Sequence, residues 1–219
     1  MAPAQHSPAP WAPAAVHAKS IAGYRALGES RVSVVRAMPR PREELTAGEW
    51  AALALLAEGP THGFAIARTM APDGEVGKIW TVRRPLVYRA LETLTGMGLA
   101  RAGGTVASSA GPQRTVLHAT PTGKRAVTRW LREPVAHVRD ARSLLMLKLL
   151  FLTRREADLE PLLTAQREHF AELGDKLTSV AATVEGFDRA LVLWRLESTT
   201  AAIRFVEAML STGVNAPSR

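Results

Sequence analysis

The sequence of 219 residues contains no cysteine. This absence excludes disulfide bonds, thiol catalysis and cysteine-ligated metal sites. Long hydrophobic runs are also missing. The longest, residues 144–152, is interrupted by Lys148 and is much shorter than the roughly 18 apolar residues that a membrane helix needs. We therefore expect a soluble, cytoplasmic protein without a membrane partner.

Motifs for enzymatic chemistry are absent as well. The chain has neither a G-x-x-x-x-G-K-[ST] nucleotide loop nor a G-x-S-x-G nucleophile elbow. Its six histidines include no close pair such as H-x-x-x-H, and its acidic residues form no ligand motif. His62 is better explained by packing or hydrogen bonding beside the turn at Gly63. We predict no catalytic activity, no metal and no cofactor.

Positive charge is what the chain has in excess, and it is unevenly placed. The formal net charge is +8, with 47% hydrophobic and 22% charged residues, a composition typical of globular proteins. Residues 46–140 hold 12 Lys+Arg against 7 Asp+Glu, whereas residues 141–219 hold 10 of each. A basic nucleic-acid reader followed by a neutral oligomerisation region would produce this division. An ordinary solvated surface would also produce it, so charge alone leaves both interpretations open.

Residues 1–44 have scattered prolines, many alanines and no sustained hydrophobic period. We expect a disordered N-terminal arm. Its basic stretch, residues 21–35, is compatible with a weak amphipathic helix of the kind found in a minor-groove arm or a transit peptide. A non-functional extension, with Met38 as an alternative translation start, is the other interpretation.

Helical signals begin at Thr46. Thr46 and Glu49 form a capping box, in which each side chain satisfies a free backbone N–H, and the helix is expected to end at residues 58–60. Thr61 is expected to cap a second helix. The predicted inward face of this helix is Phe64, Ile66, Ala67 and Met70.

A third helix is expected from about residues 81–85 to Met97, since Pro85 fits only in a first turn. Its predicted buried side is Leu86, Val87, Ala90, Leu91 and Leu94. Two short strands, 99–102 and 115–119, follow with a long Gly/Ser-rich tip between them. Thr120 then caps a fourth helix. Three helices and a two-stranded ribbon are the order of a winged helix-turn-helix domain.

Five segments carry a resemblance to a known family. They are LALLAEGPTHGF at 53–64, VYRALETL at 87–94, TPTG at 120–123, WLREPV at 130–135 and HVRD at 137–140. In this order they resemble the signatures of the PadR family, over about residues 45–210. The resemblance implies a bacterial winged-helix transcriptional regulator, usually a repressor, that dimerises through C-terminal helices. It also implies a small aromatic effector, since some members respond to aromatic or phenolic compounds.

The start of the third helix supplies most of the predicted DNA contacts. Arginine at a helix start can meet phosphates or grip guanine O6 and N7 in bidentate fashion. Arg89 is expected to point outward because Val87 and Leu91 point inward. Tyr88 either donates to a phosphate or packs as an amphipathic core residue, and each arginine either contacts DNA or is solvated. The candidates are Arg83, Arg84, Tyr88 and Arg89, with Gln113 and Arg114 at the base of the wing.

The neutral C-terminal third is rich in leucine. Helices are expected over residues 141–152, 156–183 and 187–210. The last one places an apolar seam at spacings of three and four that has no obvious partner within the chain. A second copy would bury this seam, although packing within the monomer is the alternative. Its candidate dimerisation residues are Leu193, Leu196, Ile203, Val206 (or Glu207) and Leu210.

Trp194 has two interpretations, because it either packs as plain core or lines a pocket between subunits for a flat aromatic effector. The predicted fold is mainly α with a small β-wing: an arm at 1–44, a winged helix-turn-helix domain at 45–132 and a helical dimerisation region at 133–212. The predicted function is a homodimeric, sequence-specific DNA-binding regulator, a repressor on a near-palindromic operator. The alternative is a protein-interaction or small-molecule-binding module built on a winged helix without DNA binding.

Overall fold

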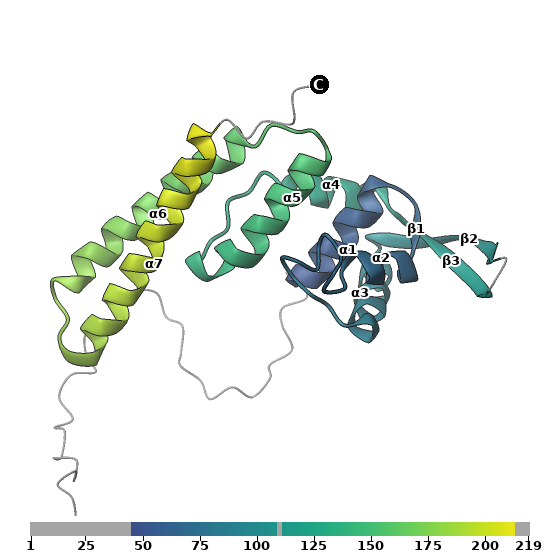
Figure 1. Cartoon of the computed structure of the whole chain (residues 1–219), viewed down its shortest axis with the longest axis horizontal. Helices are drawn as coiled ribbons and strands as arrows, with labels where there is room; N and C mark the ends of the chain where they lie inside the picture. The colour runs from purple at the N-terminus through teal and green to yellow at the C-terminus, as the bar shows by residue number, and fades with distance from the viewer. Residues whose placement is uncertain (1–44, 109–110, 213–219) are drawn as a thin grey trace, which may run out of the picture. The chain divides into compact units, whose positions relative to one another are not determined.

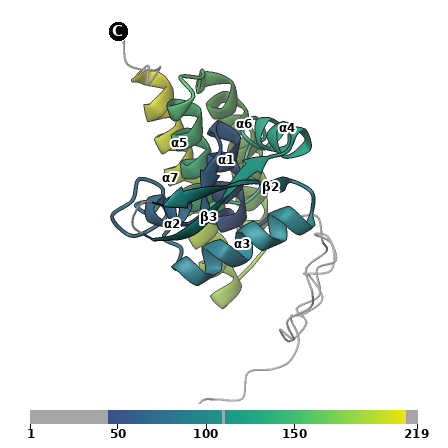
Figure 2. The same cartoon turned by 90° about the vertical axis from the view of Figure 1, so that its right-hand side faces the viewer.

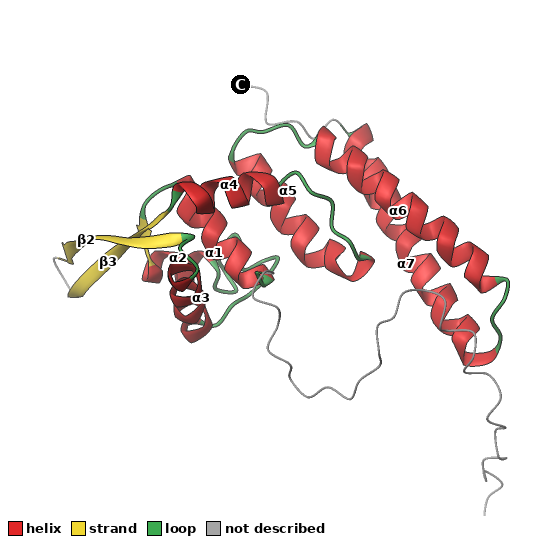
Figure 3. Ribbon diagram, turned by 180° about the vertical axis from the view of Figure 1, so that it is seen from behind, coloured by secondary structure: helices red, strands yellow, loops and turns green. Residues whose placement is uncertain are grey.

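The computed structural model describes residues 45–108 and 111–212, with only the backbone described at 105–108 and 111–114. The predicted N-terminal arm, residues 1–44, lies outside the described residues. The chain is mostly helical with one small antiparallel sheet, so the predicted fold class is confirmed (Figures 1 and 3). In chain order the elements are α1 (Ala47–Glu58), β1 (Thr61–His62), α2 (Gly63–Thr69), α3 (Arg84–Gly96), β2 (Ala100–Ser108), β3 (Gly111–Ala119), α4 (Pro121–Trp130), the 3₁₀ turn η2 (Val138–Asp140), the π-helical turn η3 (Ala141–Leu145), α5 (Met146–Arg154), α6 (Glu160–Ala181) and α7 (Gly186–Ser211). No helix in the described part of the chain is long and apolar enough to cross a membrane.

Helix α1 is the centre around which the winged helix is built. Its start confirms the predicted capping box: the Thr46 N–H donates to a Glu49 carboxylate oxygen at 2.7 Å, and the Glu49 N–H donates to Thr46 Oγ1 at 3.3 Å. Six consecutive residues, 51–56, are buried because α3, α4 and β3 pack around the helix (Figure 2). The rings of Trp50 and Trp130 stack 4.9 Å apart, which joins α1 to α4.

The start of α2 differs from the sequence-based expectation. The cap is His62 and not Thr61: His62 Nδ1 accepts the Ala65 N–H at 3.0 Å. Thr61 and His62 instead form strand β1, which pairs with Leu117 and Val116 of β3. The sheet therefore has three strands in the order β1-β3-β2. The hydrogen-bonding role expected for His62 is confirmed.

The winged region brings two further corrections. On α3, Val87, Ala90, Leu91 and Leu94 are buried as expected, but Leu86 is 53% exposed because it lies to one side of that stripe. Strands β2 and β3 pair from residues 100 and 119 out to Ser108 and Gly111, so the backbone ladder occupies most of the stretch expected to be a long tip. Thr120 Oγ1 accepts the Gly123 N–H at 3.1 Å, which confirms the predicted cap of α4.

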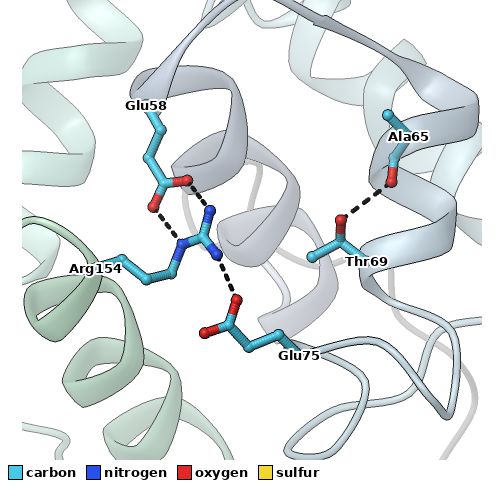
Figure 4. A network of polar contacts seen from close by, with 5 residues as sticks. All are labelled: Glu58, Ala65, Thr69, Glu75 and Arg154. Carbon is cyan, nitrogen blue, oxygen red and sulfur yellow. Dashed lines mark hydrogen bonds and ion pairs between the residues drawn. The ribbon is translucent and has the colours of Figure 1, made fainter.

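The C-terminal helices also begin later or less regularly than expected. The segment before α5 is the π-helical turn η3, and α6 begins at Glu160 because Glu156 has a positive φ of 52° that interrupts the helix. Helix α7 packs against α6 over its length (Figure 1). At the end of α5, Arg154 forms ion pairs with Glu58 of α1 and Glu75 of the loop after α2 (Figure 4).

Candidate nucleic-acid interface

One flank of α3 carries an arginine held by two aromatic rings. The Arg84 guanidinium carbon lies 5.1 Å from the centroid of the Phe64 ring on α2 and 5.8 Å from that of Tyr88 on α3. A cation over an aromatic face is attracted by the negative face of the ring. The two rings therefore fix the direction of a side chain that would otherwise be free to rotate.

This flank borders an open hollow of about 690 Å³ between α2, α3 and β3. Gly63 makes the arrangement possible, since a Cβ at this position would lie 2.8 Å from the Tyr88 ring. Thr115 of β3 and Glu92 of α3 also line the hollow. It therefore presents one cation, one carboxylate and hydroxyl groups above an apolar floor.

The predicted contact residues on α3 fall on two sides of the helix. Arg83 is the exposed N-cap residue, and no cap hydrogen bond comes from its side chain. Arg89 is exposed as expected, whereas Tyr88 lies beside Arg84 and lines the hollow. None of Arg83, Arg84 and Arg89 forms a salt bridge with a carboxylate of the described residues. Their charge is thus available to an anionic partner.

The predicted wing contacts are placed by their backbone only. Gln113 and Arg114 lie in β3, and Arg114 pairs with Val106 of β2. The side chains of both residues lie outside the described part of the structure. Their role in binding stays a prediction.

Phe64 is the residue that sequence reasoning missed. The apolar pattern predicts it on the inward face of α2, but its side chain is 40% exposed and lies under Arg84. The signal that could have found it is its position at the start of α2, directly after the turn at Gly63, where a side chain lies beside the helix end and not over the core.

The apolar seam predicted on α7 is divided between the interior and the surface. Val206 is fully buried within one copy, and Ile203 and Leu210 pack against the core, because α6 and other elements of the same chain cover this side. The expectation that the seam lacks an intrachain partner is wrong for these residues. Leu193 is 39% exposed and Leu196 is half-buried. Trp194 is 71% exposed, so it is not a plain core residue.

No group of three or more possible metal ligands occurs among the described residues. The local arrangement is instead that of a protein that reads a polymer: an arginine-bearing helix, a helix packed against its start and a two-stranded ribbon beside it. This order and pairing define the winged helix-turn-helix class (Figure 2).

Comparison with known proteins agrees with that class. The family model described as "Transcriptional regulator PadR-like family" matches residues 52–129. Residues 52–129 are thus a domain of the PadR-like family of transcriptional regulators, which confirms the resemblance seen in the sequence.

A curated relative from Mycobacterium tuberculosis, "Probable transcriptional regulator Rv1176c", is 29% identical over 92 residues, which are 42% of this chain and 47% of the relative. The match thus spans about half the length of that relative. Among solved structures, Bacillus subtilis PadR in complex with operator DNA is similar at 20% identity and a TM-score of 0.40, covering 78% of this chain and 99% of that one. The smu.1604c protein of Streptococcus mutans is similar at 14% identity and a TM-score of 0.36, covering 75% and 98%.

Proposed function

We propose that this chain is a sequence-specific DNA-binding repressor that acts as a homodimer on a near-palindromic operator. The observation that carries the proposal is the set of exposed arginines on α3, Arg83, Arg84 and Arg89, which no described carboxylate neutralises. With α3 in the major groove, these side chains meet phosphates and base edges. Gln113 and Arg114 of the wing contact the flanking backbone.

Dimerisation belongs to the same proposal. Leu193 and Trp194 leave apolar surface exposed on α7, and a second copy of the chain would cover it. Two copies related by a two-fold axis place two α3 helices on one face of the DNA. The half-sites are then about one helical turn, roughly 34–36 Å, or a multiple of it apart. A small effector that changes this spacing would release the operator.

Fluorescence anisotropy tests the DNA-binding part. The full chain is titrated onto labelled DNA from upstream of its own gene and onto scrambled DNA, at several salt concentrations. We expect a preference of at least about a thousandfold for the upstream DNA and a steep loss of affinity with salt, since phosphate contacts release counterions. The double variant Arg83→Ala/Arg84→Ala should lose affinity. Arg167→Ala/Arg204→Ala removes the same charge from exposed sites on α6 and α7 and should not.

The alternative is a protein-interaction module built on the same fold. The apolar floor and aromatic rings of the hollow beside α3 favour it, because a flat apolar surface suits a protein partner. Such a module would show no binding to either DNA at low salt. That result would exclude DNA binding by the unliganded chain.

A further inference from the structure

A second cavity lies among the C-terminal elements, away from the reading flank of α3. It measures about 810 Å³ and is lined by η2, η3, α6 and α7. None of its lining residues belongs to α2, α3 or the sheet. Its volume lies in the range of about 300–1,000 Å³ that is usual for sites of small organic ligands.

The charged side chains of this cavity all have one sign. Arg139 of η2, Arg142 of η3 and Arg195 of α7 line it, and no aspartate or glutamate does. None of the three forms a salt bridge with a carboxylate of the described residues. Three unpaired guanidinium groups around one hollow favour an anion, for which arginine offers forked, charge-assisted hydrogen bonds.

The other polar groups of the wall are already engaged. Ser198 Oγ donates to the Trp194 carbonyl oxygen and Thr199 Oγ1 donates to the Arg195 carbonyl oxygen, each at 2.8 Å. Their protons are therefore committed to the backbone of α7. The arginines remain as the donors that a ligand would meet.

The rest of the cavity wall is apolar. Leu173 and Leu177 of α6 face Leu191 and Trp194 of α7 across it. Trp194 offers a large flat surface, and its 71% exposure leaves that surface open to a ligand. Burying apolar area of this kind against a ligand is favourable by roughly 25 cal/mol per Å².

We propose that this cavity binds a small organic anion with an apolar body, its acidic group on Arg139, Arg142 and Arg195 and its body against Trp194 and the leucines. Arg142 lies in a π-helical turn, an arrangement that is frequent at functional sites. It also lines a neighbouring cavity of about 630 Å³ with Lys78 and Thr81, which directly precede α3. The site names the ligand chemistry of the effector suggested above. It is tested without DNA, so either proposal can fail alone.

Two fluorescent probes of nearly the same shape test the site. Anilinonaphthalene sulfonate carries an apolar ring system and one sulfonate, and phenylnaphthylamine has the same rings without the charge. We expect the sulfonate probe to bind the full chain saturably, with one site per chain, about tenfold or more tighter than the neutral probe. Equal affinities for the two probes, or no saturable binding because a second copy covers Trp194, would overturn the proposal.

Single variants separate the two halves of the site. Arg142→Gln and Arg195→Gln should each weaken the sulfonate probe about three- to tenfold and leave the neutral probe unchanged. Trp194→Leu should weaken both probes. Arg204→Gln, an exposed arginine on α7 that does not line the cavity, is the matched control. If Arg204→Gln weakens the sulfonate probe as much as the cavity variants do, the assignment is wrong. Circular dichroism and thermal unfolding check that each variant is folded.

Discussion

The guanidinium group of Arg84 on α3 lies over the ring of Phe64 on α2, 5.1 Å from its centroid. Two helices are thus joined at the surface by a cation and an aromatic face, beside the hollow that opens toward the wing. The side chain that the sequence singled out as a DNA contact is held in place by one that the sequence assigned to the core.

Removing the Phe64 ring should weaken DNA binding without changing the charge of α3. We expect Phe64→Ala to lower operator affinity about two- to fivefold, since an exposed cation–π contact contributes about 0.5–1 kcal/mol. Arg84→Ala should cost more, because the contact to DNA itself is lost. Anisotropy titrations at fixed salt measure both. Met97→Ala, an exposed apolar residue beyond the end of α3, is the control. An unchanged affinity in Phe64→Ala would mean that the ring does not position Arg84 for DNA.

The buried amide of Gln166 should be essential for stability. Its Oε1 accepts the Val135 N–H at 2.7 Å and its Nε2 donates to the Val135 carbonyl at 3.1 Å, so it ties α6 to the segment after α4. Gln166→Leu has a similar size but leaves two backbone groups unpaired, at about 1–3 kcal/mol each. Urea unfolding should show a loss of about 2–4 kcal/mol. A loss no larger than that of Arg167→Leu at the neighbouring exposed position would contradict this role.

Lys148 should make stability depend on alkaline pH. It is buried on α5, its Nζ donates to the Glu133 carbonyl oxygen, and it lies 5.2 Å from the centroid of the Trp130 ring. Burial lowers the pKa of Lys148 to about 8, with the Glu133 carboxylate partly opposing the shift. Between pH 8 and pH 10.5 the folded protein has lost this proton while the unfolded chain still holds it. The free energy of unfolding that Lys148 contributes therefore rises with pH in this window.

Comparison with Lys148→Met isolates that term. The difference in unfolding free energy between wild type and Lys148→Met should move in favour of wild type as pH rises from about 8 to 10.5, by at most about 1.4 kcal/mol per unit of pKa difference. Urea unfolding at a series of pH values measures it. Lys176→Met, an exposed lysine on α6, should give a flat difference over pH 7–9. A flat difference for Lys148→Met as well would contradict the lowered pKa.

Arg154 should contribute to stability through its geometry as well as its charge. Its Nε and Nη2 donate to the two carboxylate oxygens of Glu58 at 2.8 and 2.5 Å, and Nη1 donates to Glu75 (Figure 4). The hydrogen bonds to Glu58 raise the pKa of Arg154, so it is charged at all accessible pH values. Because the group is partly exposed, we expect Arg154→Ala to cost only about 1 kcal/mol, and less at high salt.

Lysine cannot reproduce the forked contact, so Arg154→Lys should recover less than half of that loss. Thermal unfolding of Arg154→Ala, Arg154→Lys and the exposed control Arg167→Ala measures the difference. Full recovery by lysine would show that charge alone matters.

The elements that the sequence predicted well are those with local causes. The capping box at Thr46 and Glu49 and the Thr120 cap with Pro121 depend on groups three residues apart, so both helix starts can be located from the sequence. The buried stripe of α3 follows the helical period. Strand β1 has no such signal, because its two residues are extended only by pairing with β3, more than 50 residues later.

The candidate site shows the same division. Arginine at the start of α3 can be identified from composition and order, and the exposure of Arg89 follows from the helical period. The contact of Arg84 with Phe64 cannot, since it needs two helices at a fixed crossing. On α7, period alone groups Val206 with Leu193, but α6 and the core bury the first and leave the second partly exposed.

The sequence by itself determined the helix starts, the winged-helix order and the family to which residues 52–129 belong, because caps, periods and motifs are written in neighbouring residues. Only the tertiary structure decided the third strand, the ring that holds Arg84 and the arginine-lined cavity beside Trp194. The physical reason is that burial and side-chain direction are set by which elements pack together, and packing joins residues that no local pattern relates.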